Sequence, residues 1–149
     1  MKIKLIVDVN VEETITITCN EYTPQIKKVH TLLQQLENTQ KNVIGYHEDM
    51  EYYLELRTIS FFETMNEVVY AHTRDKMYII KQRLYELEKS LPNEFMRISK
   101  STILNLGHLS AIETSLGGPR QIFLQKSNKA VFVSRKYYPV LKERLKERL

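Results

Sequence analysis

The sequence has one cysteine, no tryptophan, four glycines and four prolines. The single cysteine, Cys19, cannot form a disulfide within the chain, which excludes the disulfide framework that holds many small secreted domains together. No apolar run approaches the roughly 20 residues that a membrane span requires. The first residues, MKIKLIVDVN, alternate in polarity and reach Asp8 early, which indicates a strand and not a signal peptide. We therefore expect a cytoplasmic protein.

Motifs of the common catalytic sites are also missing. The sequence contains no nucleophile elbow, phosphate-binding loop or dinucleotide-binding glycine motif, and Gly117–Gly118 is better interpreted as a turn. The histidines are far apart and lack metal-ligand spacing, so each is expected to be a partly exposed polar residue: His30, His47, His72 and His108. The sequence thus predicts no enzyme, cofactor, metal site or small-molecule substrate. An enzyme would need a deep pocket with convergent carboxylates.

The charge is unevenly distributed along the chain. Residues 1–94 carry 11 Lys and Arg against 15 Asp and Glu, whereas residues 95–149 carry 11 basic and 3 acidic residues. The net charge of +4 therefore hides a C-terminal third of +8. A concentrated basic segment is expected of a protein that binds a polyanion such as nucleic acid, although charge alone does not distinguish this from an ordinary solvated surface.

Residues 1–42 are predicted to form a ββα extension. Segments 2–9 and 14–19 alternate in polarity and are rich in β-branched residues, as in a pair of strands. Thr23-Pro24 has the pattern of a helix start, and apolar residues follow at helical spacing: Ile26, Val29, Leu32, Leu33 and Leu36. This helix could pack on the rest of the chain or form a dimer seam. Packing within the chain is favoured, because five apolar positions suffice to cover a strand pair.

Residues 43–149 are predicted to be mostly β. Short strands rich in Ile, Val, Tyr and Phe are expected near 42–47, 52–57, 59–64, 67–73, 76–81, 94–99, 108–114, 120–125 and 130–134. Helices are expected at 83–91, where Pro92 stops the pattern, and from about 136 to 148. The predicted fold class is mainly β, α+β overall.

Basic and hydroxyl side chains gather at two predicted strand ends in the basic C-terminal third. Arg97, Lys100 and Ser101 precede a turn at Asn105, and Ser134, Arg135 and Lys136 lie between the last strand and the last helix. Short hydroxyls and basic groups can bind phosphate oxygens, and Arg can also contact guanine through two hydrogen bonds. In the structural alternative, Arg97 and Ser101 hold the turn together while Lys100 and Arg135 are merely solvated.

Several segments together resemble the LytTR DNA-binding domain in order and spacing. They are FFET, LYELEKSLP, FMRISKSTILN and VSRKY, and the resemblance covers about residues 43–145. It implies small antiparallel sheets that place loops, not a recognition helix, in successive major grooves of bent DNA. It further implies base contacts by Lys100 and Arg135 and a third contact loop at Asn66 and Glu67, although the Glu67 carboxylate suits a phosphate surface poorly. Phosphate contacts are expected from Arg97, Ser101 and Lys136, with Ser134 beside them and Asn105 mainly structural.

The resemblance also implies partners. Most relatives carry the domain behind a receiver domain, for which 42 residues are too few, so residues 1–42 resemble the leader of stand-alone LytTR regulators of Gram-positive bacteria. We expect a transcriptional regulator that binds double-stranded promoter DNA at repeated half-sites as a homodimer. The resemblance also implies a membrane protein encoded beside it. The alternative is an interaction protein that acts on a membrane or signalling partner and binds DNA weakly or not at all.

Overall fold

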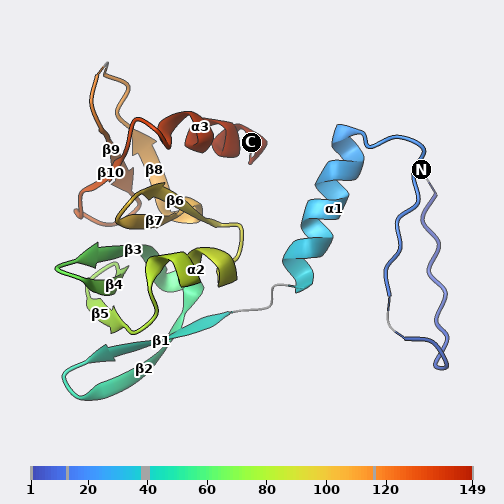
Figure 1. Cartoon of the computed structure of the whole chain (residues 1–149), viewed down its shortest axis with the longest axis horizontal. Helices are drawn as coiled ribbons and strands as arrows, with labels where there is room; N and C mark the ends of the chain where they lie inside the picture. Colours follow the sequence, from blue (N-terminus) through green and yellow to red (C-terminus); the bar gives the residue numbers. More distant parts are fainter. Residues whose placement is uncertain (1, 13, 38–40, 116, 149) are drawn as a thin grey trace.

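A computed structural model describes residues 2–12, 14–37, 41–115 and 117–148 (Figure 1). These residues form an N-terminal arm and helix followed by a mainly β domain with two antiparallel sheets. The elements are α1 (Pro24–Glu37), β1 (Asn42–His47), β2 (Met50–Glu55), the 3-10 helix η1 (Leu56–Thr58), β3 (Ile59–Met65), β4 (Val68–Thr73), β5 (Met77–Ile80), α2 (Leu84–Ser90), β6 (Phe95–Ser99), β7 (Thr102–Asn105), the 3-10 helix η2 (Leu106–His108), β8 (Leu109–Ile112), β9 (Arg120–Leu124), β10 (Val131–Val133) and α3 (Tyr138–Glu147). The predicted fold class is confirmed.

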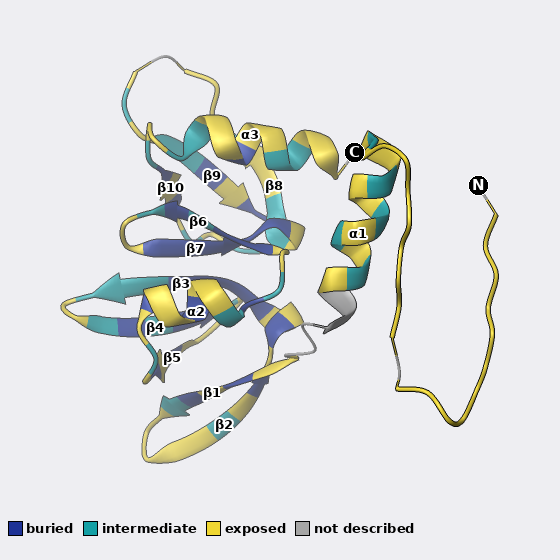
Figure 2. Ribbon diagram, turned by 45° about the vertical axis from the view of Figure 1, so that its right-hand side comes forward, coloured by how far each residue is buried: buried dark blue, intermediate teal, exposed yellow. Residues whose placement is uncertain are grey.

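The larger sheet has seven strands in the order β2-β1-β5-β4-β3-β7-β6. One of its faces packs against α2 through Leu84 and Leu87, which join Phe62 in one core cluster. The opposite face, around Phe61, packs against the three-stranded sheet β10-β9-β8 and Leu141 of α3. Both phenylalanines are fully buried because successive side chains of a strand point to opposite faces, so β3 is covered on both sides. Figure 2 shows the resulting concentration of buried residues around β3, β6 and β7.

Strand β7 was not predicted from the sequence. All four of its residues, Thr102–Asn105, are buried, so the segment lacks the alternation of a half-exposed strand. It nevertheless pairs with both β3 and β6. Asn105 is structural as expected, since its Nδ2 donates to the Ile59 carbonyl at 2.9 Å and its Oδ1 accepts from the Gly107 amide at 3.0 Å.

The two strands predicted at 2–9 and 14–19 do not form in the described part of the arm. A two-stranded hairpin is only marginally stable in water unless one face is packed, and no described residue from 2 to 34 is buried. The helix α1 is confirmed, with the Ile26 amide donating to the Thr23 hydroxyl at 3.2 Å. Its packing within the chain, favoured from sequence, leaves Ile26, Val29 and Leu33 only partly buried. The side chain of Leu36 and residues 38–40, which precede the predicted boundary between residues 42 and 43, lie outside what the structure describes.

His72 on β4 contradicts the expectation of exposed histidines. It is 6% exposed, its ring stacks on Phe61 with centroids 4.1 Å apart, and both ring nitrogens lack a hydrogen-bond partner. Burial, with a smaller effect from the charge of Lys129, lowers the pKa of His72 to about 4. Burial also raises the pKa of Glu63, whose Oε2 lies 4.0 Å from the His72 Nε2. The fold therefore holds His72 in its neutral form.

This predicts a specific loss of stability in mild acid. Because the folded pKa is below that of the unfolded chain, the unfolded state binds the proton first, and stability falls as pH drops from about 6.5 to about 4. The loss from this group should reach roughly 3 kcal/mol. Urea unfolding across this pH range should show a shallower decline for His72→Leu, whereas His47→Leu, at an exposed strand end, should follow the parent. Parallel curves for parent and His72→Leu would contradict the assignment.

Candidate nucleic-acid interface

Three connecting segments lie together at one edge of the β domain, on the left in Figures 1 and 2. They are the β3–β4 turn, the β6–β7 turn and the segment that follows β10. Two backbone hydrogen bonds link these segments or the strand ends beside them: the Thr64 amide of β3 donates to the Ser101 carbonyl at 2.8 Å, and the Ser134 amide donates to the Ile98 carbonyl of β6 at 2.9 Å. We call this region the loop edge, and define it by Asn66, Glu67, Lys100, Ser101, Ser134, Arg135 and Lys136. It brings together the sequence-predicted residues of all three contact loops.

The β3–β4 turn presents Asn66 and Glu67 to solvent. Met65 pairs with Val68, so the turn has two residues, with φ of 48° at Asn66 and 66° at Glu67. Such left-handed pairs match the twist of a hairpin and suit Asn much better than Glu. Both side chains are exposed. The structure therefore places the Glu67 carboxylate at the loop edge despite an unfavourable backbone conformation.

The β6–β7 turn is shaped by Arg97. Its Nε donates to the Ser99 carbonyl at 2.7 Å, its Nη2 donates to the Lys100 carbonyl, and its Nη1 pairs with the Glu88 carboxylate of α2 at 2.9 Å. The Arg97 side chain is only 18% exposed. These contacts correspond to the structural alternative for Arg97. The side chains of Lys100 and Ser101 remain exposed beside it.

The segment after β10 starts the last helix and exposes two cations. Two hydrogen bonds of Ser134 form this turn: its hydroxyl accepts from the Tyr137 amide at 3.4 Å, and its carbonyl accepts from the Tyr138 amide at 3.0 Å. Arg135 and Lys136 are exposed, and the Lys136 Nζ lies 5.5 Å from the centre of the Tyr137 ring. The short turn thus fixes the backbone and leaves two long basic side chains free to reach a ligand.

The sequence interpretation missed two further cations beside the loop edge. A hollow of about 700 Å³ is lined by Lys81 and Arg83 together with Glu67, Lys100 and Ser101. Lys81 lies over the Tyr46 ring at 4.2 Å, and Arg83 is exposed at the start of α2. Both belong to the acidic half of the chain, where net charge gave no indication of them. The signal that could have identified them is the run KQR between a strand and a helix.

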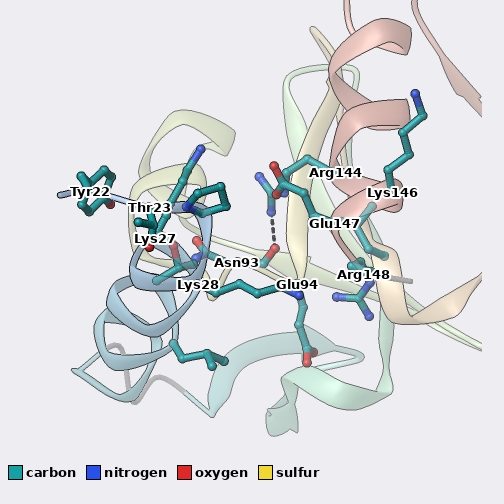
Figure 3. A pocket seen from close by; sticks show the side chains of 14 residues that line it. Tyr22, Thr23, Lys27, Lys28, Asn93, Glu94, Arg144, Lys146, Glu147 and Arg148 are labelled. Carbon is teal, nitrogen blue, oxygen red and sulfur yellow. Dashed lines mark hydrogen bonds between the residues drawn. The ribbon is translucent and has the colours of Figure 1, made fainter. Parts of the chain in front are cut away.

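Another cavity, of about 930 Å³, lies elsewhere, between α1 and the C-terminal end of α3 (Figure 3). Arg144 donates to the Asn93 carbonyl there, while the other labelled charged side chains point in different directions and do not converge on one position (Figure 3). A small-molecule site is typically apolar with a few convergent polar groups, which this cavity does not offer. Within residues 2–12, 14–37, 41–115 and 117–148, no three His, Cys, Asp or Glu side chains are grouped to hold a metal ion.

One serine and histidine pair has the geometry of an activated nucleophile but a structural role. Ser60 Oγ lies 2.9 Å from His108 Nδ1, and His108 Nε2 lies 2.7 Å from the Arg57 carbonyl. The second contact requires a proton on Nε2, so Nδ1 accepts from the serine hydroxyl. Ser60 is buried and opens onto none of the cavities described above. The pair fastens η2 to the start of β3.

Three comparisons with known proteins bear on this arrangement. The family model of the LytTr DNA-binding domain matches residues 49–146. A transcriptional regulator of Staphylococcus aureus strain bovine RF122 / ET3-1, named as uncharacterized and HTH-type, is 30% identical over 146 residues, which cover 97% of this chain and 98% of the relative. A protein of the same description from S. aureus strain NCTC 8325 / PS 47 is 29% identical with the same coverage.

The fold is similar to a solved structure as well. The LytTr DNA-binding domain of a methyl-accepting/DNA response regulator from Bacillus cereus superposes with a TM-score of 0.66 at 21% identity, covering 71% of this chain and 97% of that chain. The names of the relatives mention a helix-turn-helix motif, but the described residues contain none. Strands lie between each helix of the β domain and the next one along the chain. None of the described helices is long and apolar enough to cross a membrane.

Proposed function

The chain belongs to the LytTr DNA-binding domain family, and on that premise we propose that it regulates transcription by holding duplex DNA against the loop edge. Membership makes it a DNA-binding transcriptional regulator. The observation that carries the proposal about its interface is that two backbone hydrogen bonds hold three exposed turns, or the strand ends beside them, together at one edge. Loops fixed in this way can enter the grooves of a duplex without a recognition helix. The ligand also sets the place of action, beside the DNA in the bacterial cytoplasm.

The exposed cations divide into two roles under this proposal. Lys100 and Arg135 contact base edges, because each extends from a turn whose backbone is fixed, and both can donate to the guanine acceptors in the major groove. Lys136 and Ser101, and with them Ser134, bind phosphate oxygens and set the register. The three hydrogen bonds of Arg97 support a role in shaping the β6–β7 turn, in place of a direct phosphate contact.

The arrangement also supports binding as two copies on repeated half-sites. One loop edge is short and offers few base contacts, so a second copy on a repeated half-site would double their number. A membrane partner encoded nearby is implied by the family resemblance alone and stays a prediction.

Selection of bound sequences from a random duplex pool, at two salt concentrations, tests the base contacts. Lys100→Ala and Arg135→Ala should each weaken binding to the enriched duplex by about 1 to 3 kcal/mol and flatten base preference at one position. Affinity of the parent should fall steeply with salt, because counterions are released from the DNA. Lys146→Ala is the matched control: Lys146 is exposed near the C-terminal end of α3, which points away from the loop edge (Figure 1). Equal affinity and preference in parent, Lys100→Ala and Arg135→Ala would refute the site.

Removing the negative charge of Glu67 tests whether the β3–β4 turn faces the DNA. An exposed charge about 4 Å from a phosphate is repelled by about 1 kcal/mol, so Glu67→Gln should bind the enriched duplex about fivefold more tightly, and less so in high salt. Glu94→Gln, which removes an exposed carboxylate beside the α1–α3 cavity, should leave affinity unchanged. If both variants bind like the parent in a fluorescence anisotropy titration, the turn does not approach the DNA.

A further inference from the structure

The N-terminal arm, residues 2–12 and 14–20, has no packing partner among the residues that the structure describes. Figure 2 shows it as an exposed extended segment that stands apart from the β domain. No described residue of the arm or of α1 as far as Gln34 is buried. Monomeric proteins rarely expose so many aliphatic side chains in one segment, so an unburied apolar surface of this kind marks an interaction site.

The apolar side chains of the arm follow a regular pattern. In an extended chain alternate residues point to the same side, and within residues 2–8 the odd positions are aliphatic while the even ones, Ile6 apart, are charged. Leu5 is 87% exposed and Val7 84% exposed, between Lys4 and Asp8. The second segment repeats the pattern with Ile15 and Ile17 among threonines. A turn at residues 9–11 separates the two segments, so each segment has its own apolar side. We call the following five residues together the apolar side of the arm: Ile3, Leu5 and Val7 in the first segment, and Ile15 and Ile17 in the second.

The backbone of the arm is also unpaired. Its main-chain hydrogen bonding among the described residues is local to the turn, where the Val11 amide contacts the Asp8 carbonyl at 3.5 Å and the Asn10 amide donates to the Asp8 carboxylate at 2.9 Å. An extended segment with free amides and carbonyls is a template for a strand of another chain. The arm therefore offers two kinds of surface, apolar and hydrogen-bonding, to the same partner.

Charge along the arm is complementary to itself. Lys2 and Lys4 lie at its open end, whereas Asp8 and Glu12 lie at or next to the turn. Two arms related by a twofold axis and aligned in opposite directions place the lysines of each beside the carboxylates of the other. A twofold contact of this kind uses the same patch on both copies, which is the commonest interface among homo-oligomers.

We propose that the arm is a homodimerisation element whose apolar side is covered by the arm of a second copy of this chain. Burying an aliphatic side chain removes roughly 60 to 100 Å² from water, so the five side chains account for roughly 300 to 500 Å² per copy. A stable interface buries about 800 Å² per partner, and the partly buried apolar residues of α1 can supply the remainder. The S. aureus relative aligned over 97% of this chain spans the arm as well, so the element is part of the regulator in both proteins.

The test compares two neighbouring positions on opposite sides of the arm. Leu5 and Ile6 are both exposed aliphatic residues, at 87% and 72%, but only Leu5 lies on the apolar side. Sedimentation equilibrium of the full chain without DNA should give a mass that rises with concentration from 17.7 kDa towards twice that value. Leu5→Gln should remain monomeric at concentrations where the parent and Ile6→Gln are dimeric. Neither residue supports the β domain, so both variants should fold.

Each other outcome overturns the proposal. A parent that is monomeric at every concentration, or a Leu5→Gln variant that dimerises like the parent, shows that the arm is covered by something other than a second copy. If Leu5→Gln and Ile6→Gln weaken dimerisation equally, the apolar side of the arm is not the surface that the second copy covers. Because mass is measured without DNA, this result is independent of the proposed DNA contacts. On DNA, Leu5→Gln should bind an isolated half-site as the parent does and lose only the added affinity for a repeated site.

Discussion

Two backbone hydrogen bonds, from the Thr64 amide to the Ser101 carbonyl and from the Ser134 amide to the Ile98 carbonyl, hold the three loops of the proposed interface in one arrangement. These two hydrogen bonds form because β7 and β6 lie at one end of the large sheet. There β7 is the neighbour of β3, and β6 contacts the segment that follows β10. The burial of β3 on both faces and the contacts of Arg97 make that end of the sheet rigid. Long basic side chains then extend from a fixed backbone, which reduces the entropy lost when DNA is bound.

The same chain contains a rigid part and an unpartnered part. The β domain buries its apolar residues in two clusters on opposite faces of one sheet. The arm and α1 bury none among their described residues as far as Gln34. Under the two proposals this division has a simple use: the domain would recognise one half-site, and the arm would join two domains. Affinity then depends on both the contacts of one loop edge and the linkage between two.

Sequence patterns predicted most of the fold because most strands are half-exposed and alternate. The prediction failed for β7, which is buried throughout, and for the arm, whose alternation is present while the packing that would turn it into strands is absent. The loops at Lys100 and Arg135 stood out by their basic and hydroxyl residues, whereas the third loop, at Glu67, was identified only through the family resemblance. Nothing in the spacing of these three residues shows that they meet. The role of Arg97 required its three contacts, and Lys81 and Arg83 were hidden in a segment of negative net charge.

The central claim, that the loop edge is the surface that holds DNA, is tested most directly by amide hydrogen exchange of the full chain with and without a bound duplex. The account predicts slower exchange on DNA binding in 64–67, 98–101 and 134–136, with the C-terminal half of α3 unchanged. Protection of all three segments together is expected, because their backbones are joined by hydrogen bonds. Protection confined to other segments, with these three unchanged in the complex, would contradict the claim.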